Sequence, residues 1–205
     1  MEAEIRSISE INHRLGINRE LADEFKTILA KKVIFTKFHP IVCLATGDIV
    51  GYEALSRGPE ASIFENPAYL FEVAERLTLL EDLDMMCREK AIENASKLAL
   101  DTQSTKLFIN IDAASMVYLQ HDKGKTISFL EKYGLNIDNV VLEITERAFI
   151  KDSGAFFEAL THYQSQGFSI AIDDLGSGSA GLRLISQTNP HIVKIDKFLI
   201  ENVDK

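Results

Sequence analysis

Hydrophobic residues along the chain fall into short β-rich runs that alternate with longer stretches of helical spacing. The short runs cover residues 33–38, 49–54, 106–111, 140–144, 168–172 and 192–195. The stretches with helical spacing lie near 67–77, 81–99, 125–133, 152–166 and 179–188, and a last one begins near Lys197. This alternation predicts an α/β fold in which a largely parallel sheet is covered by helices.

Two segments depart from the simple alternation. The first two runs are joined by Ala45-Thr46-Gly47-Asp48, whose turn-forming residues predict a hairpin. Residues 3–31 show helical spacing interrupted around Gly16, followed by lysines of the kind that a helix C-terminus prefers. We therefore predict an N-terminal helical segment or linker over residues 1–32 and a barrel domain over residues 33–205.

The composition narrows the function classes. Of the 205 residues, 46% are hydrophobic and 26% are charged, as in an ordinary globular protein with a sizeable core. The formal net charge of −9 argues against binding to a nucleic acid polymer, which requires a cationic surface to replace counterions. A small anionic ligand is still compatible with this charge if local positive groups or a bound metal meet it.

Other features exclude membrane and zinc chemistry. No apolar run reaches 18 residues and the N-terminus MEAEIRSISE is charged, so we expect no membrane anchor, no signal peptide and a cytoplasmic protein. Cys43 and Cys87 lie in apolar surroundings without a partner at ligand spacing, which indicates core thiols. The five histidines form no HxxH or HxxxH pair, so a zinc hydrolase is disfavoured.

Acidic and polar residues follow the apolar part of five consecutive runs. They are Glu53, Asn110, Glu143 with Glu146, Asp173 with Asp174, and Lys194 with Asp196. In an α/β barrel the C-terminal ends of the strands meet at one mouth, so residues far apart in sequence become neighbours there. An unpaired carboxylate next to such apolar stretches would cost several kcal/mol of lost hydration, and a bound cation would remove that cost.

The ligand types point to a hard cation. Oxygen donors without Cys or His favour magnesium or manganese. Asp173 and Asp174 could serve two ions about 3.5–4 Å apart, an arrangement that activates water for phosphoryl displacement. Arg57 offers a planar fork of donors to a phosphate, and Lys194 could hold the attacking water or neutralise developing charge.

Each of these residues also has a structural interpretation. Asp173-Asp174 before Gly176-Ser177-Gly178 could form a turn with a helix N-cap. Glu53 and Glu143 could belong to an ion network with Arg57, Arg147 or Lys194, and Asn110 could be a satisfied amide at a strand end. The metal hypothesis depends on the same oxygen chemistry recurring at five strand ends.

Five segments together resemble a known family. They are GYEALSR at 51–57, FINI at 108–111, LEITE at 142–146, AIDDLGSG at 171–178 and VKID at 193–196. From about Val33 to its end the chain resembles the EAL domain, a bacterial cyclic di-GMP phosphodiesterase. The resemblance implies a TIM-like (β/α) barrel with an N-terminal β-hairpin variation. Because such barrels take about 250 residues, this chain is expected to lack roughly the last two β/α units.

The resemblance assigns roles to individual residues. It implies that Glu53, Asn110, Glu143 and Asp173 ligate one metal ion and that Asp173 and Asp174 serve a second. In the complete domain two Mg²⁺ or Mn²⁺ ions are expected, and one in this chain. Lys194, Asp173 and Glu146 form the implied catalytic group, in which Lys194 positions the water and Glu146 anchors the loop after Asp174. Substrate contacts are implied for Arg57, Leu55, His39 and Asp196. The implied substrate is cyclic di-GMP and the product linear pGpG.

Departures from the family leave alternatives open. His39 stands where the family usually has Gln, and Leu175, Ser179 and Ala180 replace residues of the loop after the paired aspartates. A glutamate of the second metal site and a downstream glutamine are also expected to be missing. The alternatives are a catalytically impaired cyclic di-GMP-binding module, or an interaction module whose open sheet edge pairs with another copy or another signalling domain.

Overall fold

The computed structural model describes residues 18–100, 105–112, 115–116, 124–145, 153–176 and 181–203. Its strands are β1 (Phe35–Val42), β2 (Ile49–Arg57), β3 (Lys106–Asn110), β4 (Val140–Thr145), β5 (Ser169–Leu175) and β6 (Ile192–Ile195). Its helices are α2 (Arg19–Ala30), α3 (Pro67–Arg76), α4 (Leu80–Lys97), α6 (Lys125–Tyr133), α7 (Ser153–Ser165), α8 (Gly181–Thr188) and α9 (Lys197–Ile200), with short 3-10 turns η1 (Ile63–Glu65) and η3 (Ile137–Asn139).

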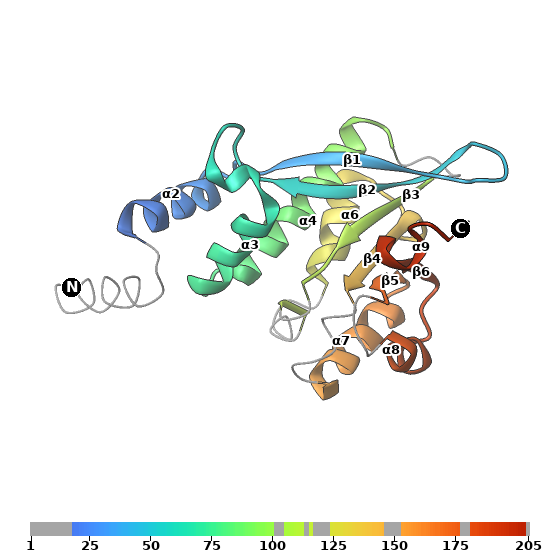
Figure 1. Cartoon of the computed structure of the whole chain (residues 1–205). Helices are drawn as coiled ribbons and strands as arrows, with labels where there is room; N and C mark the ends of the chain where they lie inside the picture. Colours follow the sequence, from blue (N-terminus) through green and yellow to red (C-terminus); the bar gives the residue numbers. More distant parts are fainter. Residues whose placement is uncertain are drawn as a thin grey trace.

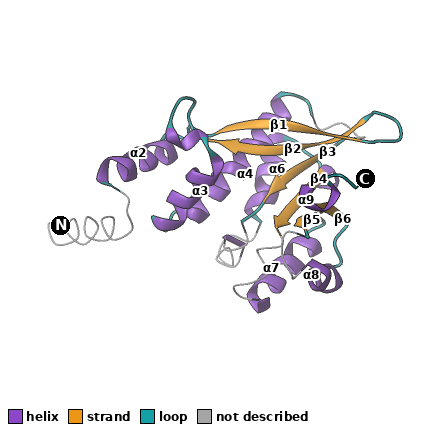
Figure 2. Cartoon of the chain, viewed as in Figure 1, coloured by secondary structure: helices purple, strands orange, loops and turns teal. Residues whose placement is uncertain are grey.

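The six strands form one sheet in chain order, from β1 to β6 (Figure 1). β1 and β2 pair antiparallel, and every later pair is parallel, as the predicted hairpin followed by β/α units requires. The sheet curls into part of a barrel (Figure 2). Along the sequence, at least one helix separates each parallel strand from the next. The predicted fold class, an incomplete TIM-like barrel with an N-terminal hairpin, is thereby confirmed.

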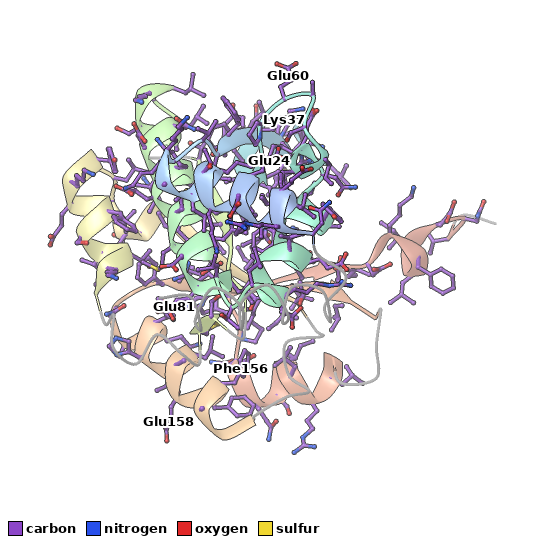
Figure 3. The ribbon with its side chains drawn as sticks, turned by 90° about the vertical axis from the view of Figure 1, so that its left-hand side faces the viewer. Glu24, Lys37, Glu60, Glu81, Phe156 and Glu158 are labelled. Carbon is purple, nitrogen blue, oxygen red and sulfur yellow. The ribbon has the colours of Figure 1, made fainter. Side chains whose placement is uncertain are left out.

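One face of the sheet packs against the helices. A large apolar core joins residues of β3, β4 and β5 to Ile92 of α4, Leu130 of α6, Phe156 of α7 and Leu184 of α8. Figure 3 shows Phe156 and Glu158 on opposite sides of α7, and Glu158 is exposed. The helices therefore cover the outer face of the curled sheet.

The inner face of the sheet carries a small apolar cluster, called the floor below, and polar residues follow it along the strands. Phe108, Val141 and Ala171 are buried together, with Ile41 and Ile192 against them. Two positions further along β3, β4, β5 and β6 come Asn110, Glu143, Asp173 and Lys194. Since side chains alternate between the two faces of a strand, these four polar residues share the inner face with the apolar floor.

Gly51 shows how tightly the floor is built. A Cβ added at Gly51 would stand 2.6 Å from Cε2 of Phe108 and 2.8 Å from the carbonyl oxygen of Lys106. Only a residue without a side chain lets β2 approach the Phe108 ring at this position. The glycine of the GYEALSR motif is thus required by packing, two residues before Glu53.

Three strands differ from their predicted bounds by more than one residue. β1 occupies 35–42 instead of 33–38, β2 continues to Arg57 and β5 to Leu175. Pairing of Phe35 with Arg57 extends the hairpin past its apolar run, because ladder hydrogen bonds do not depend on side-chain polarity. Glu53 and Asp173 consequently lie within strands and not after strand ends.

The segment before the barrel joins a second core. Asn18 caps α2 by accepting a hydrogen bond from the backbone N–H of Leu21, 2.8 Å away. The helix buries Ala22, Phe25 and Ile28 against η1, α3 and α4. Residues 1–17 lie outside the described part, and the proposed division at residue 32 stays a prediction. None of the helices that the structure describes has the length and apolar character needed to cross a bilayer.

Candidate metal centre

Three carboxylates from three strands converge on one ammonium group. The Nζ atom of Lys194 lies 2.8 Å from Oε1 of Glu143, 3.2 Å from Oδ2 of Asp173 and 3.5 Å from Oε2 of Glu53. Each carboxylate contributes an oxygen to a group whose members all lie within 4.8 Å of one another. The parallel register brings these residues together, since Asn110 pairs with Glu143, and Thr145 with Asp173.

Glu143 is the most deeply buried member. Its residue has no exposed surface, and its Oε2 atom has no hydrogen-bond partner among the described residues. Burial raises the pKa of Glu143 to about 7, although the nearby Lys194 acts in the opposite direction. A buried carboxylate oxygen without a hydrogen-bond partner is costly, and coordination of a cation would remove that cost.

Lys194 does not balance the charge around it. Burial alone would lower the pKa of Lys194, but the contact with Glu143 and the charges of Asp173 and Glu53 outweigh it and raise that pKa. With all three carboxylates ionised, one ammonium leaves a formal charge of −2. The ion network that sequence analysis offered as an alternative therefore exists with Lys194, but it has an excess of negative charge.

The geometry fits a divalent cation with oxygen ligands. Oxygens bound to one Mg²⁺ or Ca²⁺ ion lie about 2.0–2.6 Å from it, so they stand at most about 5 Å apart. The three carboxylate oxygens meet that limit. Glu53, Glu143 and Asp173 are therefore able to hold such an ion.

Two further predicted ligands lie beside this group. The side-chain amide of Asn110 donates to Oε1 of Glu53 over 3.4 Å. Asp174 is exposed, and its backbone N–H donates to Oδ1 of Asp173 over 2.9 Å. Asp174 has a φ of 54°, so the chain turns sharply immediately after Asp173. Asp174 does not belong to the compact carboxylate group itself.

The predicted substrate-contacting residues differ in their places. His39 pairs directly with Glu53 across the hairpin, and its side chain is exposed. Leu55 and Arg57 follow Glu53 at alternate positions of β2, which puts them on the same face. Arg57 donates from Nη1 to the carbonyl oxygen of Ser56 over 2.7 Å.

Asp196 makes a local hydrogen bond, and the substrate contact expected for it stays a prediction. Its carboxylate accepts a hydrogen bond from the N–H of Phe198 over 2.7 Å and so caps α9. Glu146 lies outside the described residues, as do Ser179 and Ala180. Sequence analysis assigned no role to the floor of Phe108, Val141, Ala171 and Ile192. Its signal in the sequence is an apolar residue two positions before each polar one.

Comparisons with known proteins place the chain in a family. The model of the family described as EAL domain matches residues 20–205. A curated protein of Escherichia coli K12 named probable cyclic di-GMP phosphodiesterase PdeB is 26% identical over 203 residues, which are 98% of this chain and 37% of that protein. The blue light- and temperature-regulated antirepressor BluF from the same organism is 27% identical over 168 residues, covering 82% of this chain and 40% of BluF.

Solved structures agree with these matches. Klebsiella pneumoniae BlrP1, in a calcium and cyclic di-GMP complex, superposes with a TM-score of 0.74 and 27% identity, over 83% of this chain and 42% of BlrP1. The PaMucR phosphodiesterase, in a cyclic di-GMP complex, shares the fold with a TM-score of 0.77 at 21% identity, over 90% of this chain and 75% of PaMucR. This chain spans well under half of the length of PdeB and BluF. The matched residues, the partial barrel and the carboxylate group agree, and the chain belongs to the EAL domain family.

Proposed function

We propose that residues 33–205 provide a metal-dependent phosphodiesterase unit that hydrolyses cyclic di-GMP to linear pGpG. The observation that carries the proposal is the convergence of Glu53, Glu143 and Asp173 on one point of the inner face. Relatives named as a cyclic di-GMP phosphodiesterase, or solved with cyclic di-GMP, support the choice of substrate. The substrate, the activity and the cytoplasmic location are proposals, because the chain spans only part of each relative.

The proposed chemistry is hydrolysis of one phosphodiester bond. A water oxygen bonds to phosphorus while the bond from phosphorus to the 3′ oxygen breaks, leaving a 5′-phosphate and a 3′-hydroxyl. A bound Mg²⁺ or Mn²⁺ would acidify that water and neutralise charge on the phosphate. Glu53, Glu143 and Asp173 would hold the ion, with Asn110 and Asp174 completing its surroundings.

The other predicted residues would handle the water and the substrate. The ammonium group of Lys194 lies among the carboxylates, where it can donate a hydrogen bond to the attacking water and offset negative charge. Arg57 has the fork of donors that suits a phosphate, and on β2 it lies four residues after Glu53 on the same face. Leu55 and His39 would line the approach of the nucleotide. Glu146 would support the loop that follows Asp174.

Chromatography of the reaction products tests the proposal. The complete domain, incubated with cyclic di-GMP and Mn²⁺, is expected to form pGpG, and a chelator is expected to stop the reaction. A chain that forms no pGpG and binds no cyclic di-GMP in the presence of Ca²⁺ contradicts the proposal. An Asp138→Asn variant serves as control because this exposed aspartate lies on η3, away from the carboxylate group.

A second candidate function is nucleotide binding without hydrolysis. BluF is named an antirepressor, and His39 and Leu175 depart from the usual family residues. Calorimetry with Ca²⁺ and cyclic di-GMP separates the two candidates. Binding heat without pGpG formation in Mn²⁺ favours the binding module, whereas turnover favours the enzyme.

Self-association belongs to the same proposal. β1 and β6 form the two edges of the described sheet, and β6 exposes Val193 and Ile195. An unprotected edge strand can pair with a second copy or with another signalling domain. Sedimentation is expected to show a dimer, and a clean monomer at high concentration contradicts this part of the proposal.

A further inference from the structure

The segment that follows Asp173 has an unusual backbone. Asp174 has a φ of 54° and Gly176 a φ of 101°, so two left-handed residues stand within three positions. A non-glycine residue in this region is strained and persists where surrounding contacts hold it. One of those contacts is local, the 2.9 Å hydrogen bond from the N–H of Asp174 to Asp173.

Further contacts come from the segment after β6. The N–H of Asp196 donates to the carbonyl oxygen of Leu175 over 3.0 Å. The side chain of Leu199 on α9 packs directly on Gly176, since a Cβ added at Gly176 would overlap its Cδ1 atom and lie 2.9 Å from its Cγ atom. Gly176 thus serves two needs, a left-handed backbone and space for Leu199. Figure 1 shows α9 close to β6 near the end of the chain.

We infer that Leu199 is a positioning residue, which acts through Gly176 to hold Asp173 and Asp174 in the orientation that binds metal. The inference rests on the proposed function, because it concerns the same carboxylates. Leu199 does not touch the carboxylates in any contact described for it; its contact is with the glycine three residues after Asp173. The neighbouring Phe198 is 79% exposed, against 52% for Leu199, so these two apolar residues of α9 differ in how far they are covered.

Substitutions at Gly176 and Leu199 test the inference in the full 205-residue chain. Gly176→Ala is expected to weaken Mn²⁺ binding about tenfold, and Leu199→Ala about threefold. Shortening Leu199 makes room for the added methyl group, so the double variant is expected to bind Mn²⁺ more tightly than Gly176→Ala alone. Calorimetry measures the affinity, and thermal unfolding without metal shows that each variant is folded.

Two control variants separate the effect of the Gly176–Leu199 contact from backbone strain alone and from a change on α9 alone. Gly124 has a φ of 97°, and a Cβ there would meet nothing within 4 Å. Gly124→Ala therefore introduces similar backbone strain without a steric contact like that between Gly176 and Leu199. It is expected to lower the melting temperature and leave Mn²⁺ affinity unchanged. Phe198→Ala alters the same helix at its exposed position and is expected to change neither property. A Gly176→Ala variant with normal affinity, or a double variant no better than Gly176→Ala, overturns the inference.

Hydrogen exchange without metal keeps the inference separate from the proposed function. Leu199→Ala is expected to speed amide exchange in residues 173–176 about tenfold relative to Phe198→Ala. If the unaltered chain binds no Mn²⁺, the proposed function fails, and this exchange measurement still decides whether Leu199 holds the aspartate segment. Equal exchange in both variants overturns the inference.

Discussion

Two groups of buried charges in this molecule differ in how far they are compensated. In one, Glu53, Glu143 and Asp173 surround Lys194 on the inner face of the sheet. In the other, Arg88 and Asp84 form an ion pair inside α4, and both are almost completely buried. With its carboxylates ionised, the first group has three negative charges to one positive charge, whereas the second is balanced.

The balanced pair is also richer in hydrogen bonds. Arg88 donates to the hydroxyl of Tyr163 over 2.7 Å and to that of Thr126 over 3.3 Å. Asp84 accepts a further hydrogen bond from the N–H of Asp112 over 3.2 Å, just beyond β3. These contacts join α4 to α6, α7 and the end of β3. Each group keeps a buried atom without a partner among the described residues, Nε of Arg88 in the pair and Oε2 of Glu143 in the carboxylate group, so the clearest difference between them is charge balance.

The difference separates a structural ion pair from a functional charge group. A balanced and hydrogen-bonded pair holds neighbouring elements together, and loss of one partner is costly. An excess of buried negative charge opposes folding until a cation arrives, so it is expected where binding a cation is the purpose. Each of the following predictions tests this contrast.

Asp173→Asn is expected to have the largest effect. Removal of a partner outside the ligand shell of a metal site already costs about 10–100-fold in affinity or activity, and Asp173 is a proposed ligand. We expect at least about 100-fold weaker Mn²⁺ binding, with turnover reduced at least as much. Calorimetry and product chromatography measure both. Unchanged Mn²⁺ affinity would show that the carboxylate group is not a metal site.

Arg88→Ala is expected to destabilise the fold by about 3–5 kcal/mol, because it leaves Asp84 buried without its cation. Arg76→Ala is the matched control, since Arg76 pairs with Glu72 at the surface, where such pairs contribute about 0–1 kcal/mol. Urea unfolding measures both. Equal losses in the two variants would remove the distinction between the buried and the exposed pair.

Glu143→Gln is expected to stabilise the metal-free protein at pH 8 by about 1–3 kcal/mol. The pKa of Glu143 is raised to about 7, so its contribution to stability is present below its ordinary pKa and is lost as the pH rises through about 7. The variant should therefore show a flatter pH dependence of stability. Asp84→Asn should destabilise at the same pH, because Arg88 keeps its charge when buried. Urea unfolding from pH 5 to 8 checks both, and a shift of the same sign in both variants would refute the contrast.

The smallest effect concerns the thiol of Cys87, which lies near the Asp84–Arg88 pair. Burial raises the pKa of Cys87 to about 12, whereas hydrogen bonds from Thr46 lower the pKa of the more exposed Cys43. At pH 8 a thiol reagent should modify Cys43 and leave Cys87 unmodified. In Arg88→Ala the protection of Cys87 should weaken. Rapid modification of Cys87 in the unaltered chain would show that this region opens readily.

Local patterns were enough to predict most of the fold. The predicted helices near 67–77 and 125–133 match α3 and α6 within one residue, and the run at 192–195 coincides with β6. Alternation of strand and helix also predicted the parallel order of the sheet. These features follow from side-chain periodicity within one segment, so no knowledge of distant contacts is needed.

The charged groups could be predicted only in part. Glu53, Glu143, Asp173 and Lys194 were predicted to lie together as residues of neighbouring strands. The buried position of Arg88 was not predicted, because it depends on Tyr163 and Thr126 from other helices. The substrate contact of Asp196 stays a prediction, and the described contact of its carboxylate is the cap of α9.

By itself, the sequence determined which segments are strands and helices and which oxygen donors lie along them. Only the tertiary structure decided that three carboxylates share one lysine while Arg88 and Asp84 balance each other's charge. The physical reason is that periodicity and turn chemistry act within a segment, whereas the compensation of a buried charge depends on groups that strand register and helix packing bring from elsewhere in the chain.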